Sequence, residues 1–294
     1  IKEQYIRCAK DPAFFLKTFC MIQHPIQGKI PFDLYEFQEK TINEFQENRM
    51  NIILKARQLG ISTLTAGYSL WMMTFHQDKN ILVIATKQDT AKNLVTKVRV
   101  MHANLPSWLK QSCVEDNKLS LKYKNGSQIK AVSSGTESAR SEALSLLVLD
   151  EAAFIDKIDS IWTAAQSTLT TGGQCIALST PNGVGNWFHK TWVEAEEGHG
   201  LFNFIKLHWT VHPDRDEEWR KEQDKMLGPS GAAQECDCDF ITSGTSVIDG
   251  VLLEKCKKAH NKEPLERRGV DSNLWVWEPP NYTKSYLVCA DVGR

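Results

Sequence analysis

The sequence has no strong net charge, no CxxC pair and no long apolar run. Its formal net charge is −1, so no global basic field indicates nucleic acid, although near-neutrality excludes that partner only weakly. No apolar stretch approaches the roughly 20 residues that a membrane helix needs. The eight cysteines are scattered, several of them in apolar runs, and this favours a reducing compartment over a disulfide framework. We therefore expect a cytosolic globular protein.

The 294 residues are 41% hydrophobic and 24% charged, which is ordinary for a globular protein and sufficient for a large core. The chain begins with Ile1 rather than Met, with no signal-peptide pattern, and near its other end a short apolar strand at 286–290 runs into Asp291. A strand at that place has no later strand to pair with. We therefore expect this sequence to be part of a longer chain.

Short apolar strands alternate with amphipathic helices through the middle of the chain. Strands that are apolar along their whole length indicate a parallel sheet covered by helices on both faces. The strands are predicted at 51–56, 80–87, 145–152, 174–181 and 202–209, and the helices at 62–75, 90–109 and 158–170. A hairpin is predicted at 119–132, where polar and apolar residues alternate around Asn125-Gly126. The fold class is therefore α/β, with a mainly parallel central sheet flanked by helices.

The composition changes along the chain and divides it into five parts. After Trp209 the sequence becomes charged and helical, and it later passes through a segment with three prolines. We predict an N-terminal helical segment at 1–30 and the α/β core at 31–210. A small helical subdomain, on which the N-terminal segment packs, follows at 211–261. A linker at 262–285 then leads to the first strand of a truncated domain at 286–294.

The segment KARQLGIST joins the first buried strand to a helix, where backbone N–H groups and the helix dipole bind phosphate oxygens. The strict P-loop pattern is not met: Gly60 and Ser62 fit the second glycine and the magnesium-binding hydroxyl, but Ile61 occupies the lysine position. Lys55 can supply the cation from the start of the loop, and Arg57 is the alternative. We expect the loop to bind ATP through Lys55, Ala56, Arg57, Gln58, Leu59, Gly60, Ile61, Ser62 and Thr63.

Two acids, Asp150 and Glu151, close the third buried strand about ninety residues after this loop. Ligands of open α/β sheets bind at the carboxyl ends of the strands. Asp150 can hold Mg²⁺ together with Ser62, and Glu151 can polarise the attacking water. The pair therefore predicts a Mg²⁺–ATP site with Glu151 as the catalytic base. The alternative is that both acids only cap the following helix.

LSTPNG at 178–183 ends another buried strand with polar side chains. Ser179, Thr180 and Asn182 can sense the γ-phosphate and pass the signal on. A helix-capping turn is the alternative explanation of the same residues.

YEFQ precedes the strand of the phosphate loop by some fifteen residues. Gln38 can make two hydrogen bonds to an adenine edge, with Tyr35 or Phe37 stacked on the base. A surface glutamine is the alternative.

The ordered set YEFQ, KARQLGIST, LLVLDEAAF and LSTPNG resembles the ATPase of tailed-phage terminase large subunits. That family carries an adenine motif, a deviant Walker A loop, a Walker B motif and a coupling motif in this order and at comparable spacing. The stretch 209–244 also resembles the family's segment after the motor core, so the resemblance covers nearly the whole chain. It implies a P-loop NTPase of the ASCE type that uses ATP and Mg²⁺ to move double-stranded DNA into a capsid.

The resemblance also implies roles for single residues. Some members of the family carry the loop lysine at the start of the loop, which favours Lys55. Arg140 matches an arginine suited to reach the γ-phosphate of a neighbouring subunit; a solvated surface arginine is the alternative, and Arg57 could act within its own subunit. YLVCADVG is similar to the first strand of the family's ribonuclease-H-like nuclease domain. Asp291 is then the first acid of a two-metal site, and nuclease activity is expected only of the intact protein.

Partners and location follow from the resemblance as expectations. The partners are double-stranded DNA, the viral portal protein, the small terminase subunit and further copies of this chain, which form a ring on the portal and are monomeric in solution. No membrane partner is expected, and the location is the host cell cytoplasm during phage assembly.

Two other functions remain open. The first is a superfamily-2-type helicase. DEAA is similar to the DEAD-type box of those enzymes, and Gln38 is similar to the glutamine of their Q motif. That function needs a second RecA-like lobe, which 211–294 is too short and too helical to provide. A non-catalytic nucleotide-binding scaffold is the other, indicated by Ile61 in the lysine position.

Overall fold

The computed structural model describes residues 1–132, 143–241, 263–269, 274–279, 281 and 283. The chain divides into two units, Ile1–Ser246 and Val247–Arg294. In the second unit, β11 (Glu266–Arg268) and β12 (Leu274–Val276) form a short antiparallel hairpin. This hairpin lies within the segment that we predicted as a linker.

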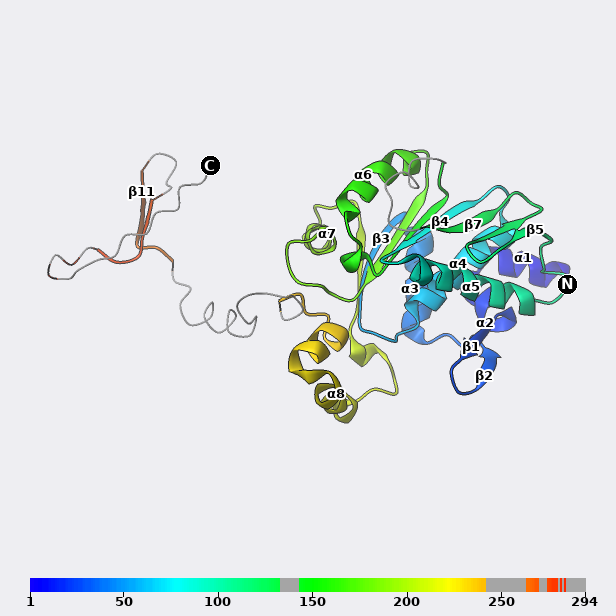
Figure 1. The fold of residues 1–294 in the computed structure, drawn as a ribbon, viewed down its shortest axis with the longest axis horizontal. Coiled ribbons are helices and arrows are strands. Elements are labelled where there is room, and N and C mark those ends of the chain that lie inside the picture. The colour runs from blue at the N-terminus through cyan, green and yellow to red at the C-terminus, as the bar shows by residue number, and fades with distance from the viewer. Residues whose placement is uncertain (133–142, 242–262, 270–273, 280, 282, 284–294) are drawn as a thin grey trace. The chain divides into compact units, whose positions relative to one another are not determined.

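A large sheet forms the centre of the first unit (Figure 1). Its strands are β3 (Met50–Lys55), β4 (Asn80–Ala85), β5 (Cys113–Asp116), β6 (Ser120–Tyr123), β7 (Gln128–Val132), β8 (Leu146–Asp150), β9 (Gln174–Ser179) and β10 (Asn203–Leu207). The eight strands are ordered β10-β3-β9-β8-β4-β7-β6-β5. The first six in that order run parallel, and β6 and β5 add an antiparallel edge. The predicted mainly parallel α/β sheet is confirmed.

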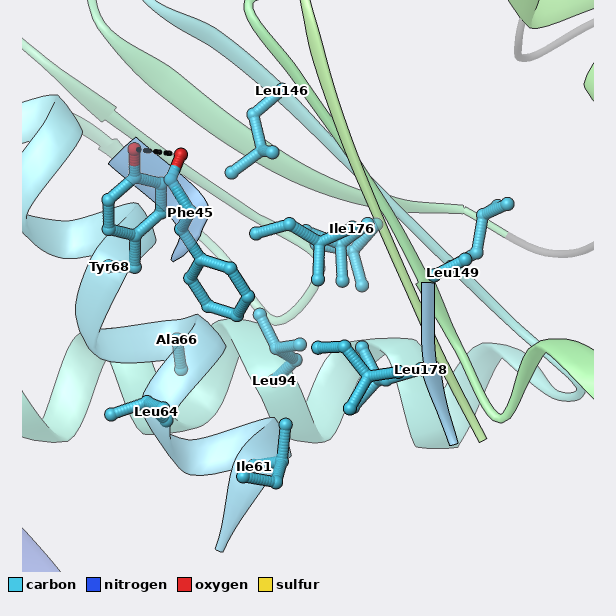
Figure 2. Close-up of a cluster of buried hydrophobic side chains, with 14 of the residues drawn as sticks. Phe45, Ile61, Leu64, Ala66, Tyr68, Leu94, Leu146, Leu149, Ile176 and Leu178 are labelled. Carbon is cyan, nitrogen blue, oxygen red and sulfur yellow. Dashed lines mark hydrogen bonds between the residues drawn. The ribbon is translucent and has the colours of Figure 1, made fainter. Parts of the chain in front are cut away.

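Helices cover both faces of this sheet, as continuous apolar strands require. The helices α3 (Glu36–Glu47), α4 (Ile61–Phe75) and α5 (Gln88–Asn104) pack on one face, and α6 (Ile158–Leu169) and α7 (Trp187–Glu196) lie on the other (Figure 1). Figure 2 shows the core between α4, α5 and the sheet, where Phe45, Leu94 and Ile176 meet. There the Tyr68 hydroxyl donates a hydrogen bond to the carbonyl oxygen of Phe45, at 3.3 Å.

The N-terminal segment covers the outer side of α4. It forms α1 (Lys2–Lys10), α2 (Pro12–Phe19) and a hairpin of β1 (Met21–His24) and β2 (Gly28–Pro31). Leu16 lies so close to Gly67 of α4 that a Cβ there would be 2.8 Å from its Cδ2 atom, and the Trp71 indole donates to the Cys8 carbonyl at 2.8 Å. We predicted that 1–30 packs on the small subdomain, whereas these contacts are with α4. The reason is that α4 is apolar on all sides, so its outer face also has to be buried.

Two local predictions around the sheet have different outcomes. The predicted hairpin is confirmed as β6 and β7, with Gly126 at φ +86° in the turn between them. The second core helix was predicted to reach residue 109, but α5 ends at Asn104. Leu105 is extended because the next residue is Pro106, which disfavours the helical conformation of the residue before it.

After β10, a 3₁₀ turn η2 (Trp209–Val211) leads to α8 (Glu217–Cys236), which consists of two helical pieces joined at a kink. Gly228 is non-helical at the kink and Pro229 follows it. Arg220 in the first piece donates to both carboxylate oxygens of Asp237, which follows the second piece, at 2.8 and 2.6 Å. In the part of the chain that the structure describes, no helix is both long and apolar enough to cross a membrane.

Candidate functional site

Four loops that follow buried strands meet at one edge of the sheet. The strand order places β3, β9, β8 and β4 side by side and parallel, so their carboxyl ends are neighbours. A cavity of about 540 Å³ opens there, lined by Arg57, Thr86, Thr90, Glu151, Phe154, Thr180 and Glu235. Ligands of α/β sheets bind at this edge, so the cavity is the candidate site.

The loop after β3 has the backbone of a phosphate-binding turn. Gln58 and Gly60 adopt left-handed conformations with φ of +58° and +74°, and α4 begins immediately after Gly60. A Cβ on residue 60 would lie 2.7 Å from the buried Nε2 atom of Gln38, so both its conformation and the close approach require glycine. The loop therefore ends at a helix N-terminus, where N–H groups are available to an anion.

Lys55, the predicted cation of this loop, is buried, and so is the residue in the usual lysine position. Ile61, which stands in that position, is 1% exposed and belongs to the core. Lys55, the last residue of β3, is 5% exposed, and its Nζ atom lies 3.1 Å from the Glu151 carboxylate oxygen Oε1. The structure thus brings together the predicted cation and the predicted catalytic base.

Asp150 and Ser62 form the second contact between these loops. The Ser62 hydroxyl donates to the Asp150 carboxylate at 3.0 Å, and Asp150 is 5% exposed. Burial raises the pKa of Asp150 above its usual range and the charge of Glu151 raises it further, whereas Lys55, Ser62 and Lys97 oppose this rise. A hydroxyl and a carboxylate held together are hard oxygen donors of the kind that Mg²⁺ prefers. The predicted metal residues are therefore neighbours.

The side chain of Arg57 pairs with a residue of α8 rather than with these two carboxylates. Its side chain is 67% exposed, and its Nη1 atom lies 3.2 Å from the Glu235 carboxylate in α8. Its backbone N–H also donates to the Glu235 carbonyl, at 2.7 Å. Arg57 therefore connects the phosphate loop to α8, while Lys55 faces Glu151.

The turn after β9 links Glu151 to α8. Ser179 accepts a hydrogen bond from the N–H of Ala153 at 3.1 Å, and the Asn182 amide donates to the Ala153 carbonyl at 3.0 Å. Ala153 lies two residues after Glu151, which is itself held at φ +54°. The Gln234 side chain in α8 donates to the Pro181 carbonyl at 3.0 Å. Two of the predicted coupling residues thus fix the backbone that carries Glu151, and Thr180 lines the cavity.

Gln38 is buried between the start of α3 and the phosphate loop. It is 3% exposed, its Oε1 atom accepts from the N–H of Tyr35 at 3.2 Å, and its Nε2 atom donates to the Leu59 carbonyl at 2.9 Å. The surface-glutamine alternative is therefore wrong. Through these two hydrogen bonds the amide holds the start of α3 against the phosphate loop.

An aromatic cluster lies at the start of α3. Tyr35 and Phe37 stack with their ring centroids 5.6 Å apart and their planes 7° apart. The His212 ring lies 4.6 Å from that of Tyr35. Tyr35 is partly exposed, so it retains a face on which a base can stack. Arg140 and Asp291, the other two residues with predicted roles, lie outside the described residues.

A family comparison decides the identity of this arrangement. Residues 52–255 match the model of the N-terminal part of the terminase large subunit, T4-like-virus type. This chain belongs to that family. The matched region contains the phosphate loop, the acid pair, the coupling turn and α8, so the family predicted from the motif order is confirmed, and with it the packaging-motor class of function.

Solved terminase structures share the fold. The ATPase domain of the Thermus phage P74-26 large terminase is 21% identical over 71% of this chain and 95% of that domain, with a TM-score of 0.59. The large terminase of the HK97 bacteriophage is 19% identical over 85% of this chain, with a TM-score of 0.58. A large terminase from a thermophilic bacteriophage is 12% identical over 71% of this chain, with a TM-score of 0.57. This chain spans 51% of the HK97 protein and 54% of the protein from the thermophilic bacteriophage.

Two charged residues of this terminase chain were missed by the sequence analysis. Glu235 lies in α8 and lines the cavity opposite Glu151. Lys97 lies in α5, where burial lowers the pKa of its ammonium group while the charge of Asp150 opposes this. Neither residue belongs to a nucleotide motif, and each reaches the site only because of tertiary packing. Periodicity would have marked both helices as amphipathic but would not have shown which charge turns toward the site.

Proposed function

We propose that this chain is the ATP-hydrolysing motor of a terminase large subunit, which drives double-stranded DNA into a viral capsid. The observation that carries the proposal is the pair of contacts across β3 and β8. Lys55 meets Glu151 and Ser62 meets Asp150, so a loop built to hold phosphate faces two carboxylates at one sheet edge. The large terminase from the thermophilic bacteriophage has been solved in complex with ADP, which supports nucleotide binding here.

The residues of the site divide the chemistry between them. The backbone of 55–63 holds the phosphates, and Ser62 and Asp150 would hold Mg²⁺, which would supply positive charge beside the phosphate oxygens. Lys55 then contacts phosphate instead of Glu151, and this frees the Glu151 carboxylate to orient the attacking water and accept its proton. The contact between Lys55 and Glu151 shows that the two side chains are within reach of each other and of a phosphate held by the loop.

A change at the γ-phosphate can reach α8 by two routes that are already in contact. Arg57 joins the phosphate loop to Glu235, and Gln234 joins α8 to the turn that holds Ala153. Loss of these contacts when phosphate binds or leaves would loosen the attachment of α8 to the core. We propose that this movement is what shifts DNA.

The remaining functional assignments extend this proposal to the whole assembly. The partners are double-stranded DNA, the viral portal protein, the small terminase subunit and further copies of this chain in a ring on the portal. The protein acts in the host cell cytoplasm during phage assembly. Asp291 begins a nuclease site that uses a pair of divalent metal ions in the full-length protein.

An ATPase assay tests the proposed function against its two alternatives. The chain is expected to release phosphate from ATP in the presence of Mg²⁺ and to lose this activity when EDTA removes the metal. Nucleotide binding without any turnover would identify a scaffold instead. Strand displacement on a forked DNA duplex would identify a helicase, and a translocase is expected to show none.

Arg140 gives a separate prediction about assembly. An arginine finger accelerates phosphoryl transfer by ~10³–10⁵-fold, so rings of Arg140→Ala subunits and rings of Glu151→Gln subunits should each be inactive. If Arg140 acts on the neighbouring subunit, mixing the two variants on the portal should restore ATP hydrolysis. Each Arg140→Ala site then receives the arginine of a Glu151→Gln neighbour. Mixed rings as inactive as both parents would show that Arg140 acts within its own subunit.

A further inference from the structure

Arg215 reaches the phosphate loop from a distant part of the chain. It lies in the short segment between η2 and α8, and its guanidinium group spans two successive carbonyl groups of the loop. Nη1 donates to the Arg57 carbonyl and Nη2 to the Gln58 carbonyl, both at 3.1 Å. A planar guanidinium can make two such bonds at once because its donors form a rigid fork, which an ammonium lacks.

These two carbonyls determine where the loop's N–H groups point. In a planar trans peptide, the C=O and the following N–H point in opposite directions. A guanidinium that holds the carbonyls of residues 57 and 58 on one side therefore holds the N–H groups of Gln58 and Leu59 on the other. Among the hydrogen bonds of the described residues, neither of these N–H groups has an acceptor. The left-handed conformation of Gln58 brings such N–H groups together into an anion-binding concavity.

The guanidinium is itself held in place. It lies over the Trp219 ring, with its central carbon 4.4 Å from the ring centroid. The N–H of Trp219 donates to the Asp216 side chain at 2.8 Å, so the ring belongs to the capped first turn of α8. Packing of this kind reduces the entropy that Arg215 loses when it binds the loop.

We propose that Arg215 is a positioning residue for nucleotide phosphate in this chain. It fixes two peptide planes so that their N–H groups face the phosphates, and its charge polarises both peptides and strengthens those N–H groups as donors. The proposal rests on the proposed function, because it concerns the same nucleotide site. Arg215 touches no phosphate itself and acts only through the loop.

Arg215→Lys is the variant that tests this role, since it keeps the charge but cannot span both carbonyls. The dissociation constant of Mg²⁺–ADP should rise about tenfold, which is about 1.4 kcal/mol, because a lysine can hold only one of the two carbonyl groups. The KM for ATP should rise by a similar factor. The kcat should change by less than about threefold, because Lys55 and Glu151 are intact. Binding of adenosine, which has no phosphate, should stay the same.

Arg49→Lys is the matched control. Arg49 also donates to two backbone carbonyls, those of Leu169 and Gly173, but at the opposite edge of the sheet. Arg49→Lys should lose about as much thermal stability as Arg215→Lys, but it should bind ADP like the wild type. Trp219→Leu is a second variant, which removes the ring under Arg215 and should weaken ADP binding in the same direction. It carries the test if Arg215→Lys does not fold.

Three results would overturn the inference. These are an unchanged ADP affinity in both Arg215→Lys and Trp219→Leu, an equal loss in Arg49→Lys, and an equal loss of adenosine binding. A wild-type chain that binds no ADP would instead remove the proposed function, and this inference with it. If the wild type binds ADP and both Arg215→Lys and Trp219→Leu bind it equally well, the inference falls and the proposed function stands.

Discussion

Glu151→Gln is expected to lower ATP turnover by ~10²–10⁴-fold while ATP remains bound. The amide has the shape of the carboxylate but accepts no proton from the attacking water. The substitution also removes the charge that pairs with Lys55 at 3.1 Å, so the ammonium is free to contact phosphate. Affinity for ATP should therefore stay equal to that of the wild type or increase. Steady-state phosphate release gives kcat, and equilibrium binding of ATP gives the affinity.

Glu39→Gln is a suitable control for this variant. Glu39 also pairs with a lysine, Lys17, at 2.5 Å, but both side chains are partly exposed on the surface. Its removal should leave both kcat and ATP affinity unchanged, because exposed ion pairs contribute little. Normal hydrolysis by Glu151→Gln would exclude Glu151 from the mechanism. Another group that lines the cavity would then have to activate the attacking water.

The parts of the site that the sequence predicted are those built from single strand–loop junctions. The loop after β3, the acids after β8 and the turn after β9 each carry a local pattern of apolar strand followed by polar residues. Parallel strands present their carboxyl ends at one edge, so these patterns predict a common site without knowledge of the strand order. The contacts between Lys55 and Glu151 and between Ser62 and Asp150 follow from that rule. The chemical roles of these residues stay predictions until variants are measured.

The parts that could not be predicted depend on packing between distant segments. Glu235 and Arg215 belong to a charged segment whose sequence has no nucleotide motif, and they meet Arg57 only because α8 returns to the phosphate loop. Gln38 was recognised as part of a motif, but its burial against Gly60 depends on how closely α3 approaches the loop. The cover of α4 by the N-terminal segment was missed for a related reason. A helix that is apolar on all sides indicates burial but does not identify the second partner.

Lys55→Ala is the other variant with a large expected effect. Turnover should fall by ~10²–10³-fold, the cost of removing one group that stabilises transition-state charge in a water-excluded site. ATP should also bind more weakly, because the same ammonium contacts the phosphates of the ground state. Phosphate release and equilibrium ATP binding separate the two effects. Lys17→Ala is the control, since it removes an exposed ammonium and should change neither.

Removal of Lys55 also changes the pKa of Asp150 in a measurable way. Lys55 now opposes the rise in the pKa of Asp150, so its loss should raise that pKa further above the unfolded value near 3.8. An acid whose pKa is higher in the folded state favours folding when protonated, and this contribution is lost as pH rises above the unfolded value. The free energy of unfolding of Lys55→Ala should therefore fall further below that of the wild type at pH 8 than at pH 5. Chemical denaturation at the two pH values measures the difference.

Arg57→Ala decides between the two candidate cations. Arg57 is mostly exposed and bound to Glu235, so in this structure it is not placed against the carboxylate pair, whereas Lys55 is. If Lys55 is the main phosphate cation, Arg57→Ala should retain more ATP affinity than Lys55→Ala. Ile61→Lys should not rescue Lys55→Ala, because position 61 faces the core and an ammonium there would lose its hydration. A silent Lys55→Ala together with an inactive Arg57→Ala would reverse the assignment, because Arg57 would then have to leave Glu235 to neutralise the phosphates.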